Sequence, residues 1–186
     1  MKVFENQVFT PDDFALDTDA EYISCEFRGV SLFKSKMNGV RFTDCTFESC
    51  NLAVVNFIDA ALNDVRFRNC KMTGADFSKC QAFLFSVSFA NCDLAMAIFH
   101  KNDLKNTMFD GSNLRESSFV EVNLHGAEFS NCDLEKSTFD HANLERADFR
   151  SARNYSINPN NNRLKKTVFS MPDAIGLVDH LDIMIK

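Results

Sequence analysis

The sequence predicts an all-β fold in which the chain winds into a four-sided coil. Large apolar side chains recur at every fifth position from Tyr22 to Phe149, with one shift of two residues between Phe77 and Leu84. A period of five fits neither the 3.6 residues of an amphipathic helix nor the two of a strand. Four such units, each a straight side and a corner, close a square lap, and stacked laps hydrogen-bond at about 4.8 Å.

Grouping the central residues by twenty supports this architecture. Twenty residues are Phe and none is Trp, as expected if one inward position demands the same shape in every lap. One side of the coil then carries Phe27, Phe47, Phe67, Phe89, Phe109, Phe129 and Phe149. The next side carries Leu32, Leu52, Met72, Leu94, Leu114 and Leu134. We therefore expect a layered interior in which each large side chain contributes about 1.5 to 3 kcal/mol.

Small residues stand two positions before each centre, and cysteine is one of them. The six cysteines in this position are Cys25, Cys45, Cys50, Cys70, Cys92 and Cys132. Ala, Val and Ser occupy the equivalent place in other units, so the pattern indicates buried free thiols rather than disulfides or metal ligands. Cys80 lies in the shifted segment and fits either register. Free thiols, together with the absence of an apolar stretch near the ~20 residues that span a bilayer, predict a cytoplasmic protein without membrane contact.

Four segments follow along the chain. Residues 1–21 are expected to cap the first lap, with a short helix starting at Thr10 and Pro11. Residues 22–150 form the coil, and the polar residues 151–169 form an exit turn region in which the five-residue period is lost. Residues 170–186 are expected to form a capping helix and then a short strand, in which Leu181, Ile183 and Ile185 alternate with polar or flexible residues.

Repeated units identify a family resemblance. Ala75-Asp76-Phe77-Ser78 and Ala142-Asn143-Leu144-Glu145-Arg146 resemble the A(D/N)LXX signature of the pentapeptide-repeat family, and the likeness extends over about 130 residues. The resemblance implies a right-handed, four-sided β-helix. The carboxyl-terminal segment is similar to the element that joins two solenoids in the gyrase-interacting, quinolone-resistance type members. It therefore implies a homodimer held by Ile175, Val178, Leu181 and Ile183.

Catalysis finds no support in the sequence. His100, His125, His141 and His180 are scattered, with no cysteine or carboxylate pair at ligand spacing, and no glycine-rich phosphate loop is present. We therefore expect a protein that is not an enzyme and that has no cofactor or metal.

Charge is distributed unevenly along the chain. The formal net charge is -6, which disfavours direct nucleic-acid binding, and Arg28, Arg66 and Arg68 are interpreted as part of a solvated face. Residues 84–150 carry eleven Asp and Glu against six Lys and Arg. Such a surface suits a basic partner. The candidate partner-binding residues are Asp93, Asp110, Glu116, Glu128, Asp133, Glu135 and Asp148.

Two functions remain open from the sequence. The family resemblance implies a DNA-like rod that binds a type II topoisomerase, DNA gyrase or topoisomerase IV, and modulates it or protects it from quinolones or toxins. The alternative is an interaction scaffold with an unrelated protein partner. The quinolone-protecting plasmid members carry sizeable projecting loops, whereas here the only expected interruption lies within Ser78 to Phe83, so drug protection is the less expected form of the first function.

Overall fold

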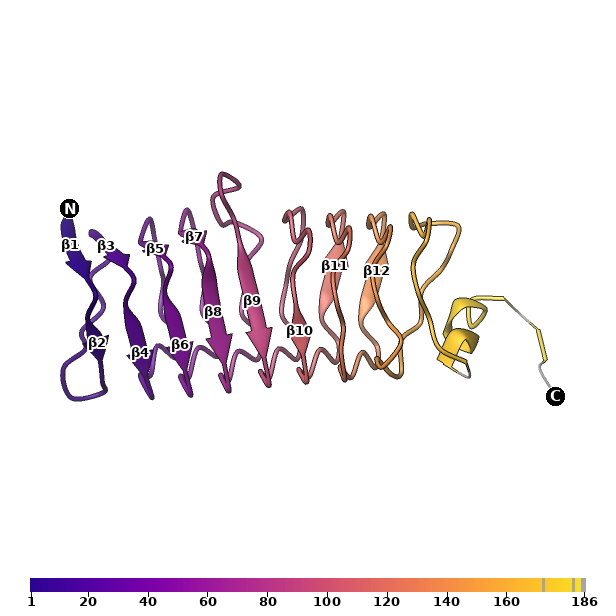
Figure 1. Cartoon of the computed structure of the whole chain (residues 1–186), viewed down its shortest axis with the longest axis horizontal. Helices are drawn as coiled ribbons and strands as arrows, with labels where there is room; N and C mark the ends of the chain where they lie inside the picture. The colour runs from indigo at the N-terminus through magenta and orange to yellow at the C-terminus, as the bar shows by residue number, and fades with distance from the viewer. Residues whose placement is uncertain (172, 182, 185–186) are drawn as a thin grey trace.

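The computed structural model describes residues 1–171, 173–181 and 183–184, and it shows a rod with the two chain ends at opposite ends (Figure 1). The chain climbs the rod one lap at a time, and every strand pairing is parallel. The predicted all-β solenoid is confirmed.

Twelve short strands lie on the sides of the laps within the described residues. A four-stranded sheet has the order β1 (Lys2–Glu5), β3 (Ala20–Ile23), β5 (Arg41–Thr43) and β7 (Ala61–Asn63). A six-stranded sheet comprises β2 (Val8–Phe9), β4 (Glu26–Arg28), β6 (Thr46–Glu48), β8 (Val65–Arg68), β9 (Val87–Ala90) and β10 (Phe109–Asp110). The remaining pair is β11 (Ser118–Val120) and β12 (Thr138–Asp140).

Strand register confirms the twenty-residue lap. Phe27 lies beside Phe47, and Phe47 beside Phe67. Across the shifted segment the offset becomes twenty-two, since Phe67 lies beside Phe89. Isolated bridges extend the same offsets to the other sides of the coil, for example from Asp93 to Asn113 and from Asn113 to Asp133.

Four sides can now be named by their inward central residues. The first side carries Tyr22, Phe42, Leu62, Leu104, Leu124 and Leu144. The second side carries Phe27 and its six successors to Phe149, and the third carries Leu32 and its five successors to Leu134. The fourth side carries Met37, Phe57, Phe77, Phe99, Phe119 and Phe139.

Stacked rings fill the interior. Along the second side consecutive rings lie nearly parallel, with centroids 5.0 Å apart for Phe109 and Phe129. The fourth side forms a matching stack, with 5.1 Å between Phe99 and Phe119. The two stacks meet edge to face, as at Phe99 and Phe109. Offset stacking and edge contacts are the favoured aromatic geometries, so one inward position accepts Phe lap after lap.

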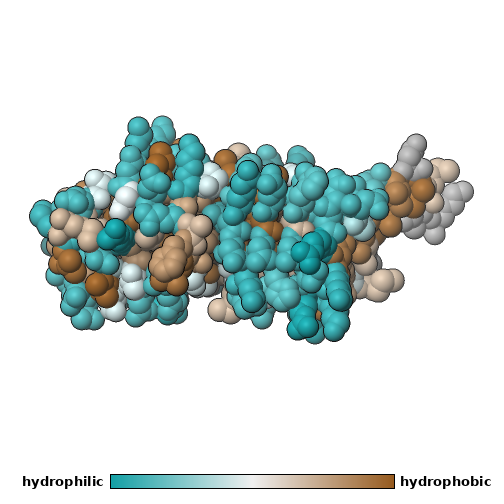
Figure 2. All heavy atoms as spheres, turned by 90° about the horizontal axis from the view of Figure 1, so that it is seen from above, coloured by the Kyte–Doolittle hydropathy of each residue, from teal (hydrophilic) through white to brown (hydrophobic). Residues whose placement is uncertain are grey.

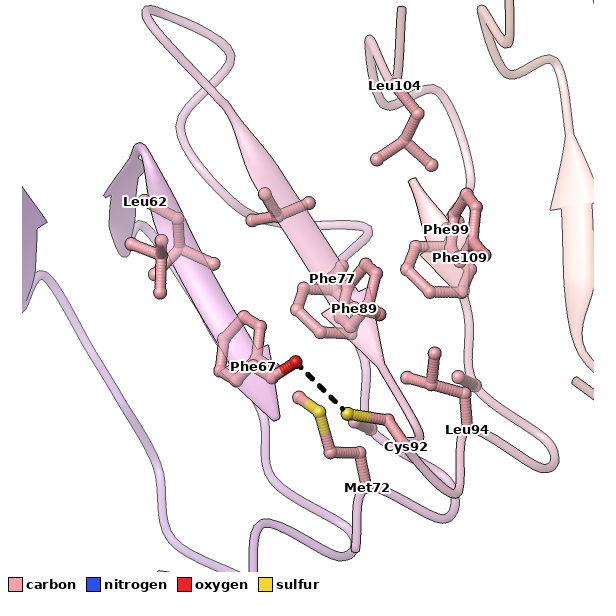
Figure 3. Packing of buried hydrophobic residues seen from close by; sticks show 14 of the residues in the cluster. Leu62, Phe67, Met72, Phe77, Phe89, Cys92, Leu94, Phe99, Leu104 and Phe109 are labelled. Atoms are coloured by element: carbon pink, nitrogen blue, oxygen red, sulfur yellow. Dashed lines mark hydrogen bonds between the residues drawn. The ribbon is translucent and has the colours of Figure 1, made fainter. Parts of the chain in front are cut away.

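Buried thiols add hydrogen bonds to this packing. In the close view of Figure 3, the Cys92 thiol donates to the Phe67 carbonyl oxygen at 3.4 Å. Cys50 and Cys70 donate in the same way to Phe27 and Phe47. All six predicted inward cysteines are buried and free, and Cys80 is half-buried.

Corners depend on a left-handed residue two positions after the centre. Glycine occupies this position in five corners, but most corners use other residues, including Val54 at φ 57°. At Leu52 the Val55 N–H closes the turn onto the Leu52 carbonyl. A turn closed in this way with positive φ at its third residue is type II.

One central residue is wrong in the sequence prediction. Leu84 was placed inward, yet its side chain is 59% exposed, and Phe85 is buried instead. The two extra residues are not absorbed in a corner. They bulge out as a loop before β9, visible at the top of Figure 1. Phe83, in the segment before β9, is 80% exposed. Because this loop lies outside the stacked laps, the five-residue period does not hold across it, and the period therefore assigned Leu84 in place of Phe85.

The first segment is a lap of the rod rather than a separate cap. β1 and β2 pair with β3 and β4 at an offset of eighteen, which places Phe4 against Tyr22 and Phe9 against Phe27. The expected helix at Thr10 is absent. Residues 11–13 form a turn, in which the Asp13 carboxylate accepts a bond from the Thr10 hydroxyl.

The coil also continues beyond the predicted end at residue 150. Asn143 bridges to Arg163 and Asp148 to Val168, while the Phe169 ring stacks on Phe149. Leu164 and Phe169 keep the period that the polar residues around them obscured. After them comes a single 3₁₀ helix, η1 (Asp173–Leu177). Instead of the expected strand, residues 178–181 form turns and a bend, and 183–184 are irregular; Asp182 and Ile185 lie outside the described residues.

Candidate partner-binding surface

Seven acidic residues predicted to bind a partner project from neighbouring sides of the rod. Asp110, Glu128 and Asp148 lie on the second side, where Glu128 bridges to Asp148 one lap later. The others follow the third side and its corner: Asp93, Asp133 and Glu135 flank central leucines, and Glu116 stands at a corner. The structure therefore places the seven residues on two adjoining sides.

Arginines neutralise two of the acids on the third side. Arg115 pairs with Asp133 at 3.5 Å and also contacts the Glu135 carboxylate. Arg153 pairs with Asp133 from the next lap at 3.3 Å. Partial burial opposes ionisation of Asp133, but hydrogen bonds from Asn154 and the Glu135 N–H, together with the two arginines, hold its pKa below the ordinary value.

Asp148 and Asp93 are also engaged. The Arg150 guanidinium donates hydrogen bonds to the Asp148 carboxylate, from Nε at 3.0 Å and from Nη2 at 2.6 Å to Oδ2. These bonds lower the pKa of Asp148. Asp93 is half-buried and accepts hydrogen bonds from the Thr73 hydroxyl and the Asn113 amide. These carboxylates stabilise the rod more than they offer charge to a partner.

Of the seven candidates, Asp110, Glu116 and Glu128 form neither an ion pair nor a side-chain hydrogen bond with any described residue, and all three are exposed. The sequence held the signal that separates them from the others. Arg115 stands twenty residues before Glu135, and Arg153 stands twenty after Asp133, so the lap length places each arginine beside its partner. A total of acidic and basic residues over 84–150 does not reveal these pairs, because it takes no account of the lap on which each arginine lies.

The four predicted dimer residues lie together at the carboxyl-terminal end. Ile175, Val178, Leu181 and Ile183 line one shallow hollow with Asp179. Ile175 and Ile183 are more than half exposed. Figure 2 shows hydrophilic residues over most of the visible face and hydrophobic atoms near this end of the rod.

Attachment of this end to the coil depends on Gly176. The Ile157 N–H donates to the Gly176 carbonyl oxygen at 2.9 Å, and Gly176 is buried. A Cβ at Gly176 would lie 2.0 Å from the Tyr155 carbonyl oxygen, so only glycine fits. The helix therefore packs directly on the last lap.

The described residues contain little that suggests a metal site or a catalytic site. No group of three or more His, Cys, Asp or Glu side chains in residues 1–171, 173–181 and 183–184 is arranged to hold a metal ion. His100 Nε2 lies 2.7 Å from the Ser118 hydroxyl, a pair that the sequence prediction missed. Over the same residues no carboxylate bonds the other ring nitrogen of His100. Such a carboxylate is the third group that orients the base of a nucleophilic serine.

The helix that the structure describes is too short and too polar to cross a bilayer.

Together these features define a class, the right-handed four-sided β-solenoid built from five-residue units. The sequence profile of the pentapeptide repeat region matches residues 20–84 and 82–158, so the chain belongs to the pentapeptide-repeat family. A comparison with curated protein sequences gives no match.

Solved structures of the same fold cover the whole chain. A trypsin-treated variant of QnrB1, a plasmid-mediated fluoroquinolone resistance protein, aligns with a TM-score of 0.65 and 16% identity over 100% of this chain and 98% of its own. Full-length QnrB1 aligns with a TM-score of 0.63 and 17% identity over 97% of each chain. At these identities the likeness shows the fold.

Proposed function

We propose that the protein is a non-catalytic, DNA-like rod that binds a type II topoisomerase. The observation that carries the proposal is the set of unpaired carboxylates Asp110, Glu116 and Glu128 on consecutive laps of a narrow β-rod. No residue that the structure describes pairs with them, so all three are available to a cationic partner. The likeness in fold to a fluoroquinolone resistance protein is consistent with this proposal.

Dimerisation through the carboxyl-terminal hollow is part of the proposal. A monomer that exposes Ile175, Leu181 and Ile183 beside one another leaves apolar area that a second copy would cover. Nine rings stack along the second side, so eight spacings of about 4.8 Å give a rod of roughly 40 Å. Two rods end to end would span about 80 Å, the length of about 24 base pairs at 3.4 Å each.

A supercoiling assay with purified DNA gyrase tests the function. We expect inhibition by the unmodified protein at micromolar concentration and a loss of about tenfold in potency in Asp110→Lys/Glu128→Lys, because two reversed charges would repel the basic surface. Asp12→Lys/Asp59→Lys is the matched control, since it makes the same change in net charge in the first laps. Equal loss in both variants would indicate a non-specific effect of net charge.

A scaffold with an unrelated protein partner is the second candidate, and the ion pairs favour it. Four of the seven acids are already engaged within the rod, which reduces the charge available for imitating DNA. In that case neither gyrase nor topoisomerase IV would respond to the unmodified protein, with or without a fluoroquinolone.

A further inference from the structure

A trench crosses the second side of the rod where β9 presents its outward side chains. Ser88 and Ala90 are small, whereas β8 before them carries Arg66 and Arg68 at the paired positions. On the other flank Ala90 pairs with Asp110, and Met108 lies two residues before Asp110 in the chain. The result is a hollow of about 290 Å³. It is lined by these residues together with Phe67 of β8 and Phe89 of β9.

The walls of the trench differ in chemistry. Arg66 is fixed by the Asp44 and Asp64 carboxylates at 2.8 and 2.7 Å, so its guanidinium is held in place. Arg68 forms no ion pair with any described residue. The opposite wall offers the Met108 side chain, which is 52% exposed, and the Asp110 carboxylate.

These walls match the dimensions of an aromatic ring. The flanking strands lie two strand spacings apart, about 9.6 Å, so a ring standing over β9 lies about 5 Å from each. Cations attract a ring face within about 6 Å of its centroid, and a thioether does so at about 5 Å. An apolar cavity of about 150 Å³ holds benzene, so the trench has room for a phenol.

Charge narrows the choice of ring. Asp110 disfavours an anionic ligand, and Arg66 and Arg68 disfavour a cation. A neutral ring with one hydrogen-bond donor satisfies both walls, because its hydroxyl can donate to Asp110 or to the Ser88 oxygen. We propose that this trench docks a tyrosine side chain of a protein partner. This proposal does not depend on which protein supplies the tyrosine.

Titration of the full-length protein with N-acetyl-tyrosinamide, followed by amide NMR shifts, tests the proposal. A fragment of this size in a suitable site should bind with a Kd on the order of 1 mM. We expect shifts at Ser88, Ala90 and Met108, and binding of N-acetyl-leucinamide about tenfold weaker because it lacks the ring contacts. Equal affinities for the two amides, or tighter binding of adenosine, would overturn the proposal.

Two variants complete the test. Ala90→Leu should fill the trench and abolish the tyrosinamide shifts, whereas Ser130→Leu, at the same position of the second side two laps later, should leave them unchanged. Arg68→Gln keeps the shape of the trench and should weaken tyrosinamide severalfold. Unaltered binding in both Ala90→Leu and Arg68→Gln, with spectra that show an intact fold elsewhere, would place the ring at another site.

Discussion

Each inward cysteine does more than fill a small space. All six donate a hydrogen bond to the carbonyl oxygen of a central residue in the preceding lap, as Cys45 does to Tyr22 at 3.3 Å and Cys25 to Phe4 at 3.4 Å. The sequence predicted these residues as small and buried, which the structure confirms. It could not predict the hydrogen bond, because an alternation among Ala, Val, Ser and Cys indicates the size of the side chain and does not indicate which carbonyl a thiol points toward.

Burial of these thiols should make the protein unstable at alkaline pH. Burial raises the pKa of Cys45 and of Cys132 to about 12, against about 8.5 for a cysteine in the unfolded chain. Since the folded-state pKa is the higher one, the stabilisation is complete below about pH 8.5 and is lost as the pH rises toward 12. Between pH 8 and pH 10 each thiol should remove about 2 kcal/mol from the free energy of unfolding.

Urea denaturation at the two pH values measures this loss. In Cys45→Ala/Cys132→Ala the difference between pH 8 and pH 10 should shrink by about 4 kcal/mol, although the variant is less stable at pH 8. An unchanged difference in the double variant would mean that these two thiols ionise in the folded state.

At the level of elements, repeated units were predicted well and unique ones poorly. Of the central residues assigned from the period, only Leu84 is exposed, because periodicity averages over many laps. The loop at Phe83 and the end of the chain occur once, so no repetition corrects a local misreading. The sequence predicts a capping helix within residues 170–186, but nothing in it distinguishes an α-helix from the five residues of η1.

Gly176→Ala should detach η1 from the coil. The added Cβ meets the Tyr155 carbonyl oxygen, which is backbone and has no freedom to move aside, so we expect the docked state to lose about 1 to 3 kcal/mol. Hydrogen exchange at the Ile157 amide should become faster, because its acceptor is the Gly176 carbonyl. If the carboxyl-terminal hollow joins two copies, light scattering should report a monomer.

Gly39→Ala is the control for this prediction. An added Cβ there meets no atom within 4 Å, although the residue has φ 71°. It should cost about 1 kcal/mol of local strain and leave both the Ile157 amide and the mass of the particle unchanged. Slow exchange at Ile157 in Gly176→Ala would show that the last lap accommodates the methyl group.

On the scale of the whole molecule, the rod is longer than the sequence indicated, because both end segments join the stack. Phe4 and Phe9 stack one lap before Tyr22 and Phe27, but the offset of eighteen hid them from a search at twenty. Leu164 continues the first side within a run of polar residues. The seven candidate acids lie on two adjoining sides of the rod, and their ion pairs with Arg115 and Arg153 follow the same twenty-residue lap that the period of five indicates.

Charge density separates this rod from the DNA that it is proposed to imitate. Each chain has a formal charge of -6, far below the two charges per base pair of a duplex, and four of the proposed binding acids are engaged in the rod. A duplex also releases condensed counterions, which gives a logarithmic slope of affinity against salt of about -5 to -9 for six to ten phosphate contacts. For the rod bound to gyrase we expect a slope of only about -2 to -3, because the rod has no layer of condensed counterions to release.

Fluorescence anisotropy at several salt concentrations measures both slopes on the same enzyme, and Asp110→Lys/Glu128→Lys should flatten the slope of the rod. A slope as steep as that of DNA would contradict this account of the surface, and a slope of zero would remove charge from the recognition altogether.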